Sequence, residues 1–342
     1  MVRSRRSAIV LVFAALLASS AGCEEPRVAR RPPEMVAMDG KEPAPAATAE
    51  RGAAARGAPA KAALTTGEPV VGFDGTKFQT AFYAPVSLAV KNDRFDLVIH
   101  FHGRHQVAVD ALEQSGMPVA LVNVDIGVGS HVYRGAYDAA GTLDHLVGLA
   151  ERSLHETGRL PNARVGRIAI SAWSAGYGAA RAILGRPADA ARVDALLLVD
   201  GLFADWDAKR SGRPRVPSME ALAPTTAFAA LATRGEKLFF LSHTAITQAQ
   251  YAGPPDCADL LIKHFEAPRS AVPASARPFG GSATYVSDLG DFHVRGYDGK
   301  AFGEHAEQHR GMGAVHYAEL RRFWERPKTS PAAHPARERG SP

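Results

Sequence analysis

The sequence predicts an α/β fold with a mostly parallel central sheet and helices on both faces. Short runs of consecutive apolar residues alternate along the chain with segments whose apolar residues recur at helical spacing. The apolar runs are continuous rather than alternating with polar residues, as expected for strands that are covered on both faces. Regular alternation of strands and helices implies crossover connections, which make neighbouring strands parallel.

The predicted elements follow one another closely. The segment 142–157 has apolar residues at helical spacing, and a final helix is predicted to run to about Trp324. Residues 70–90 are expected to supply one or two edge strands. The predicted strands cover 95–102, 118–124, 167–170, 193–199, 237–241 and 292–296.

One segment, 201–236, is too long and irregular for a simple crossover between two of these strands. It contains Trp206, a basic run and a helix-like stretch over 219–232. We predict that it forms a cap over a pocket. The alternative is an ordinary crossover helix with a solvent-exposed loop added to it.

The first 23 residues are predicted to be an export signal. Three arginines precede an apolar run over 8–18, which is too short to span a membrane. Small residues followed by Cys23 resemble a bacterial lipoprotein signal, in which this cysteine is lipidated after cleavage, although Ser20 stands where such signals usually have Leu. Ordinary secretion is the alternative. In the lipoprotein interpretation Glu24 favours the outer membrane, so the expected location is the periplasm or the outer membrane, with membrane contact through the lipid.

Two further segments are expected to be disordered: a linker over 24–66 and a tail over 327–342. The linker is rich in Ala, Pro, Arg and Glu and has no aromatic residue, so it cannot bury enough apolar surface to fold. The excess of basic residues lies in these terminal segments, and a single domain over 67–326 is left close to neutral. A nucleic-acid partner is therefore not expected. If Cys23 carries lipid, Cys257 has no partner for an intrachain disulfide.

The segment 167–184 carries the strongest functional signal. It is predicted to form a strand, a turn of small residues around Ser174, and a helix. The turn, Ala-Trp-Ser-Ala-Gly, differs from G-x-S-x-G only at Ala172. Such a turn exposes a serine hydroxyl and directs a helix N-terminus at a developing oxyanion. The small residues Gly176 and Gly178 favour this interpretation over a serine that only caps a helix.

The order of these features resembles the α/β-hydrolase superfamily. A strand ends in His102-Gly103, the nucleophile turn follows at Ser174, another strand ends at Asp200, and histidines come late in the chain. The resemblance implies that Ser174 is the nucleophile. It also implies an oxyanion hole made by the amide of Ala175 and an amide in the loop after Gly103, that of Arg104.

The acid and the base are less sharply defined by the sequence. Asp200 is the predicted acid because it ends a strand, with Asp288 and Asp291 as reserves. His305 is the predicted base and His309 the second candidate, since both lie near the start of the final helix. We expect His293, inside a strand, to be structural, and His316 to lie too deep in the helix.

A competing pattern is the H-x-H-x-x-H spacing of His100, His102 and His105, which is found in zinc hydrolases. Arg104 stands where those sites have an acidic residue, and zinc would leave the serine turn unexplained. We therefore predict an exported serine hydrolase that cleaves an ester or related acyl bond of a small or lipid-like substrate, with no cofactor or metal. A zinc hydrolase and a non-catalytic binding lipoprotein are the alternatives.

Overall fold

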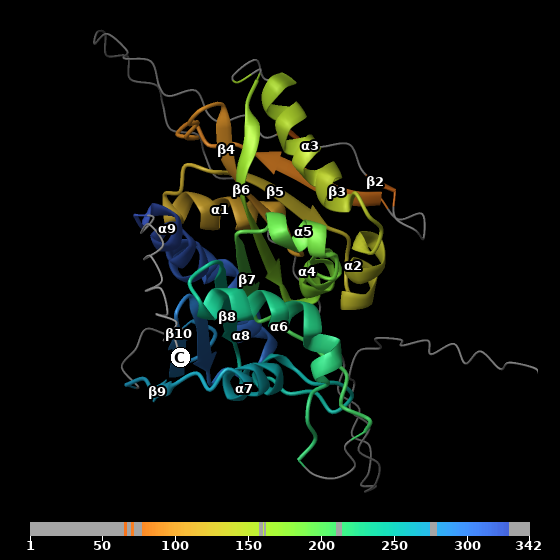
Figure 1. The fold of residues 1–342 in the computed structure, drawn as a ribbon, viewed down its shortest axis with the longest axis vertical. Coiled ribbons are helices and arrows are strands. Elements are labelled where there is room, and N and C mark those ends of the chain that lie inside the picture. Colours follow the sequence, from red (N-terminus) through yellow and green to blue (C-terminus); the bar gives the residue numbers. More distant parts are fainter. Residues whose placement is uncertain are drawn as a thin grey trace, which may run out of the picture. The chain divides into compact units, whose positions relative to one another are not determined.

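A mixed β-sheet runs through the centre of the protein (Figure 1). The computed structural model describes residues 65–66, 70–71, 77–156, 160, 162–209, 214–273 and 279–327. The predicted signal peptide with Cys23, nearly all of the predicted linker and residues 328–342 of the tail lie outside this part. No helix among the described residues has the length and apolar character needed to cross a membrane.

Eleven strands are present in the described residues. Along the sheet they are ordered β1-β3-β5-β4-β6-β7-β8-β11-β10-β9, and β2 pairs with β3. The six strands from β5 to β11 in this order are parallel, whereas the strands at both edges are antiparallel. Their bounds are β1 Thr65–Thr66, β2 Val70–Val71, β3 Lys77–Tyr83, β4 Arg94–Phe101, β5 Ala120–Asp125, β6 Arg164–Trp173, β7 Ala195–Val199, β8 Leu238–His243, β9 Arg269–Ala271, β10 Ala283–Leu289 and β11 Phe292–Tyr297.

Helices cover both faces of the sheet, and the predicted α/β fold class is confirmed. Their bounds are α1 His105–Ser115, α2 Ser130–Tyr137, α3 Thr142–Glu156, α4 Tyr177–Leu184, α5 Pro187–Arg192, α6 Met219–Thr233, α7 Pro254–His264, α8 Phe302–Met312 and α9 Ala318–Glu325. A π-helical turn, Gly313–Tyr317, joins α8 to α9. The final helix predicted from the sequence is thus a continuous helical segment, α-helical at both ends and π-helical over Gly313–Tyr317.

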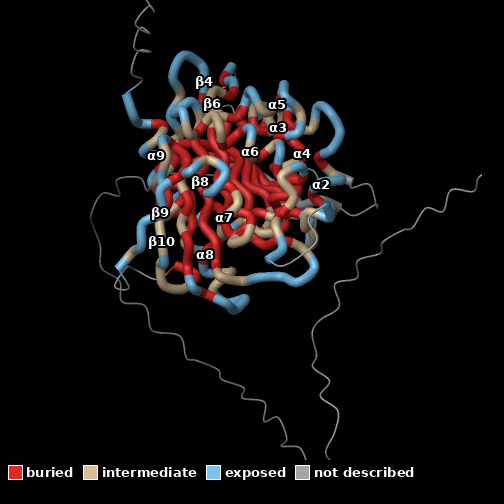
Figure 2. The backbone as a smooth tube through the Cα atoms, turned by 60° about the horizontal axis from the view of Figure 1, so that its bottom comes forward, coloured by how far each residue is buried: buried red, intermediate tan, exposed pale blue. Residues whose placement is uncertain are grey.

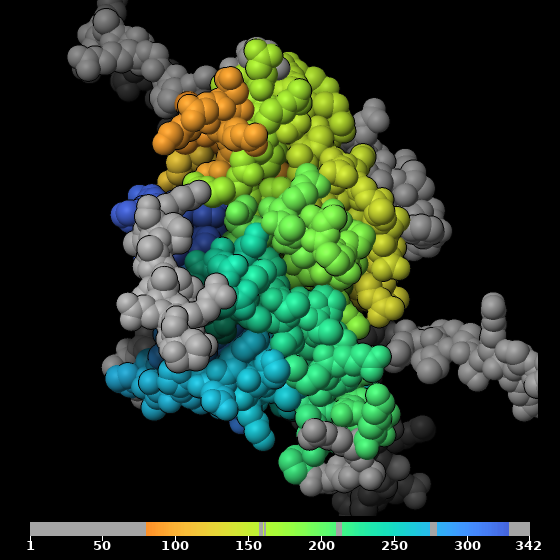
Figure 3. Space-filling view, in the orientation of Figure 1, coloured from red at the N-terminus to blue at the C-terminus, as the bar shows by residue number. Residues whose placement is uncertain are grey.

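Successive strand residues point to opposite faces, so the parallel strands supply two hydrophobic cores. On β4, Leu97 and Ile99 join the core formed with helices α2, α3, α4, α6 and α7, whereas Val98 joins the core formed with α1, the π-helical turn and α9. The buried residues lie along the sheet in the middle of the molecule (Figure 2). In the view of Figure 3, the chain from α3 to α7 makes up much of the visible surface.

Three features of the structure bear on the predicted organisation. The strand β1 pairs with β3, so the sheet begins inside the segment 24–66 that was expected to be a linker. The helical part of the predicted cap is α6, which packs on β8 and β11 because it is the crossover helix that precedes β8. The antiparallel strands β9 and β10, which extend the sheet beyond β11, were not predicted.

Candidate active site

The candidate site lies where four neighbouring parallel strands end. Phe101 of β4 lies beside Ala172 of β6, Trp173 of β6 beside Val199 of β7, and Val199 beside Ser242 of β8. The chain therefore leaves the sheet side by side at four points, namely His102, Ser174, Asp200 and Thr244. The carboxyl edge of a parallel sheet is where such folds bind ligands.

Ser174 occupies a tight turn between β6 and α4. Its φ is 48°, in the left-handed region that costs a non-glycine residue free energy, and a short 3-10 turn over Ser174–Gly176 leads into the helix. A Cβ on Gly176 would lie 2.2 Å from the carbonyl oxygen of Phe101, and one on Gly201 would lie 2.7 Å from the backbone nitrogen of Ser174. Only glycine fits at either position, because the neighbouring atoms belong to backbone.

Asp200 and His305 form a close pair. His305 Nδ1 lies 2.7 Å from Asp200 Oδ2, and the carboxylate is 2% exposed. Thr244 donates two further hydrogen bonds to Asp200, from its backbone nitrogen to Oδ1 at 3.0 Å and from its hydroxyl to Oδ2 at 2.8 Å. These three hydrogen bonds satisfy both oxygens of the buried carboxylate and fix its orientation. Thr244 was not predicted as a site residue, because its position directly after a strand is its only distinguishing feature in the sequence.

Trp173 connects this pair to the serine turn. Its indole nitrogen donates a 3.3 Å hydrogen bond to the carbonyl oxygen of His305, and the two rings stack with centroids 4.9 Å apart. Gly201, the residue after Asp200, packs against the backbone of Ser174. The backbone of Ser174 and the Asp200–His305 pair therefore lie at the same end of the sheet, although Ser174 and His305 are 131 residues apart in the sequence.

His309, the second candidate base, has different neighbours. Its Nε2 lies 3.3 Å from Nε2 of His100, and its ring stacks on Trp173 with centroids 4.4 Å apart. Burial and the nearby histidines lower the pKa of His309 to about 2. A ring with so low a pKa is a weak base, and the contact between a carboxylate and an imidazole is made by His305 instead.

The predicted oxyanion residues lie at two helix starts. Arg104 immediately precedes α1, and Ala175 lies in the 3-10 turn that leads into α4. The loop before Arg104 has two residues in the left-handed region, His102 with φ of 74° and Gly103 with φ of 103°. Backbone amides at helix starts have no partner within the helix and are suited to bind an anion.

The imidazoles of the competing zinc pattern contact separate partners. His100 Nδ1 lies 2.8 Å from the hydroxyl of Ser171, and His102 Nδ1 lies 3.0 Å from the hydroxyl of Tyr133. The side chain of His105 makes no hydrogen bond through either ring nitrogen. Within the described ranges no three His, Cys, Asp or Glu side chains are grouped as metal ligands. Two of the three imidazoles are thus hydrogen-bonded to hydroxyl groups.

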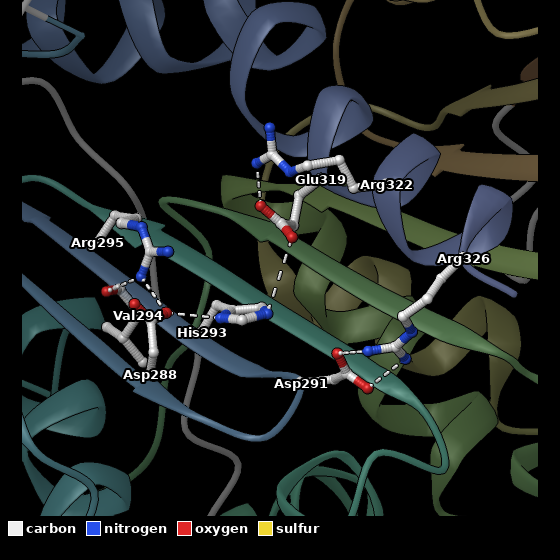
Figure 4. A network of polar contacts seen from close by, with 8 residues as sticks. All are labelled: Asp288, Asp291, His293, Val294, Arg295, Glu319, Arg322 and Arg326. Carbon is white, nitrogen blue, oxygen red and sulfur yellow. Dashed lines mark hydrogen bonds and ion pairs between the residues drawn. The ribbon is translucent and has the colours of Figure 1, made fainter. Parts of the chain in front are cut away.

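The two reserve acids are engaged in ion pairs elsewhere, at the β10–β11 hairpin (Figure 4). Asp288 lies 2.6 Å from both His293 Nδ1 and Arg295 Nη1. Asp291 receives two hydrogen bonds, at 2.8 and 2.7 Å, from Arg326. Neither carboxylate contacts His305 or His309 in these pairs. His293 takes part in this network, which agrees with the structural role expected for it.

His316 is buried in the π-helical turn. Its Nε2 lies 3.1 Å from the hydroxyl of Ser242 and 3.2 Å from the carbonyl oxygen of Leu198. Burial lowers its pKa to about 3. The ring therefore packs near the carboxyl ends of β7 and β8, one residue before each strand ends, and its hydrogen bonds go to these strands.

Comparison with known proteins gave structural likenesses alone. No protein-family model and no curated protein matches the chain. Among solved structures, a siderophore hydrolase, EstA, from Aspergillus nidulans is 14% identical with a TM-score of 0.42, and the match covers 80% of this chain and 99% of that one. Carboxyl esterase 2 from Tuber melanosporum is 14% identical with a TM-score of 0.37, covering 78% and 87%. An uncharacterised protein from Capnocytophaga ochracea is 8% identical with a TM-score of 0.43, covering 75% and 64%. At these TM-scores the likenesses carry no argument about function, which must come from the site.

Proposed function

We propose that this protein is a serine hydrolase of the α/β-hydrolase type that cleaves an ester or related acyl bond. The observation that carries the proposal is the contact between buried Asp200 and partly buried His305, at the same end of the sheet as a serine held in a left-handed strand-to-helix turn. Carboxylate, imidazole and serine in this arrangement form the usual machinery of acyl transfer. The chain order Ser, Asp, His is the one that this fold uses.

In the proposed mechanism Asp200 accepts a hydrogen bond from Nδ1 of His305, which leaves Nε2 free to take a proton. Ser174 Oγ attacks the acyl carbon as its proton passes to Nε2, and the amides of Ala175 and Arg104 bind the oxyanion. The protonated His305 then gives its proton to the leaving group. Water, activated in the same way, attacks the acyl-enzyme and releases the acid.

A fluorophosphonate probe tests this proposal directly. Such probes react with activated serines, so wild-type protein should be labelled on Ser174 and the Ser174→Ala variant should not. The matched pair His305→Ala and His309→Ala tests the base: the first should lose labelling and turnover of a short-chain chromogenic ester. Intact wild-type protein that takes no label would favour the non-catalytic binding lipoprotein instead.

We further propose that the chain is exported to the periplasm and anchored in the outer membrane through lipid on Cys23. The support is the sequence of the first 23 residues, with its basic start, short apolar run and small residues before the cysteine. Growth with a labelled fatty acid should place the label on the wild-type protein in the membrane fraction. A Cys23→Ser variant should carry no label, and label retained by that variant would contradict the anchor.

A further inference from the structure

His309 contacts both segments that would supply the oxyanion amides. A Cβ built on Gly103, the residue before Arg104, would lie 2.2 Å from Cε1 of His309. On its other side the ring lies nearly parallel to the indole of Trp173, with an angle of 3° between the planes. Trp173 precedes Ser174 and Ala175 directly. The imidazole of His309 therefore contacts both segments of the proposed oxyanion hole, the Gly103–Arg104 loop and the Trp173–Ala175 turn.

A buried polar contact fixes the orientation of this ring. His309 Nε2 lies 3.3 Å from His100 Nε2, and His100 Nδ1 lies 2.8 Å from the hydroxyl of Ser171 on the neighbouring strand. Burial lowers the pKa of His100 to about 3, so both rings remain neutral at ordinary pH. One neutral ring can then donate to the other, which holds His309 in place without a buried charge.

Two backbone features fit this arrangement. Gly103 has φ of 103°, and its missing side chain leaves the space that the edge of the His309 ring occupies. The indole nitrogen of Trp173 bonds to the backbone of α8 one turn before His309, at His305. The helix that carries His305 is thus also attached to the serine turn, and His309 extends that attachment to the Gly103 loop.

We propose that His309 is a positioning residue, whose ring sets the spacing between the Gly103–Arg104 loop and the Trp173–Ala175 turn so that both amides reach the same oxygen. This inference rests on the proposed function. It assigns His309 a role without proton transfer. This role requires a flat ring at position 309, because one face of the ring packs on the Trp173 indole and its edge packs on the backbone of Gly103.

Three variants of His309 separate positioning from proton transfer and from simple stability. His309→Ala should lower kcat for a short-chain ester by about 10²-fold with KM nearly unchanged, because a shift of about 1 Å in a catalytic group costs that much. His309→Phe keeps a ring between the two segments, so it should recover most of the activity that the alanine variant loses. His309→Gln fills space without a ring and should resemble the alanine variant, which keeps the test decisive if His309→Ala does not fold. Circular dichroism and thermal unfolding identify folded variants.

The contact with Gly103 gives a second, independent test. Gly103→Ala should lower kcat strongly in the wild-type background, where the new methyl group meets the ring. In the His309→Ala background the same change should cost at least tenfold less, because the space is then open. Gly141→Ala is the matched control for backbone strain, since Gly141 has φ of 84° and no atom within 4 Å of its Cβ position. It should leave kcat unchanged.

The outcomes distinguish this inference from the proposed function. If wild-type protein is inactive and takes no fluorophosphonate label, the proposed function is refuted and His309 has no oxyanion hole to position. If wild type is active but His309→Ala keeps kcat, the positioning role alone is refuted. Equal, complete loss in His309→Ala and His309→Phe, with His305→Ala active, would instead identify His309 as the base.

Discussion

Replacement of Asp200 by asparagine should abolish most of the activity while leaving the fold in place. The reason lies in the three donors that surround the carboxylate: the backbone nitrogen of Thr244, the hydroxyl of Thr244 and Nδ1 of His305. An asparagine has one oxygen and one NH2 group to face them. The backbone N–H cannot turn round, so the oxygen must face it, whereas a hydroxyl can rotate and an imidazole can change tautomer. The NH2 group therefore faces His305.

The magnitude follows from this orientation. An NH2 group opposite Nδ1 selects the tautomer with the proton on Nε2, so His305 can no longer accept the proton of Ser174. Loss of the correct tautomer at the equivalent place in a serine protease costs about 10⁴-fold in kcat, or about 5.5 kcal/mol at 1.36 kcal/mol per decade. Stability should fall by only about 1–2 kcal/mol, since each of the three groups around residue 200 keeps a hydrogen-bond partner and only the charge-assisted bonds are replaced by weaker ones.

Two measurements on the same preparation check this expectation. Turnover of a chromogenic ester gives kcat, and urea unfolding gives the free energy of unfolding. Thr244→Val is the matched control: it removes one hydrogen bond from Asp200 but keeps the charge, so kcat should fall about tenfold. Turnover by Asp200→Asn within tenfold of the wild type would refute the assignment of Asp200 as the acid.

Three further predictions concern the rest of the fold. Asp288→Asn and Asp291→Asn should keep wild-type turnover in the same ester assay, because these carboxylates pair with arginines at the β10–β11 hairpin; loss of activity in either would argue against Asp200. Gly178→Ala should lower the free energy of unfolding, measured in urea, by about 1–3 kcal/mol or more, because the new Cβ would lie 1.9 Å from the backbone oxygen of Ser130. Gly135→Ala on α2 is the control: its Cβ would have open space, so the change should be neutral or slightly stabilising. Stability should also fall as the pH drops from about 6.5 toward 4, by roughly 1.4 kcal/mol per pH unit for each histidine whose pKa burial lowers, because the unfolded chain then binds protons that the native protein does not. Urea midpoints that stay constant between pH 6.5 and 4.5 would contradict this for the three residues, His100, His309 and His316.

The fold was largely predictable because its parallel strands are covered on both faces. Each of β4 to β8 contains a short apolar run, and this pattern needs no tertiary information. The edge strands β9 and β10 could not be recognised in the same way. Most residues of β10 are only partly buried, and all three of β9 are exposed, so neither shows a continuous apolar run. Residues 201–218 lengthen the connection between β7 and the crossover helix α6, so the sequence pattern of this segment allows either a cap or a crossover.

The candidate site was predictable where a backbone constraint leaves a mark in the sequence. The turn at Ser174 needs a small residue at Gly176, since a side chain there would meet the backbone of Phe101. Such constraints are local and can be read directly. Thr244 is different, because its two bonds to Asp200 depend on the pairing of β7 with β8, and a threonine after a strand has no distinctive pattern.

The sequence pattern alone does not distinguish His305 from His309 as the base. The two residues are one turn apart on the same face of α8, so helical spacing gives them equal access to the serine turn. What separates them is their position along the helix: His305 lies level with the strand end at Asp200 and contacts its carboxylate. His309, one turn further along, lies between Trp173 and Gly103, and its polar contact is with His100. About 6 Å along the helix axis thus decides which imidazole has a partner for its protonated form. Because the same helix turn links both rings, a variant that shifts α8 should change the function of His305 and the position of His309 together.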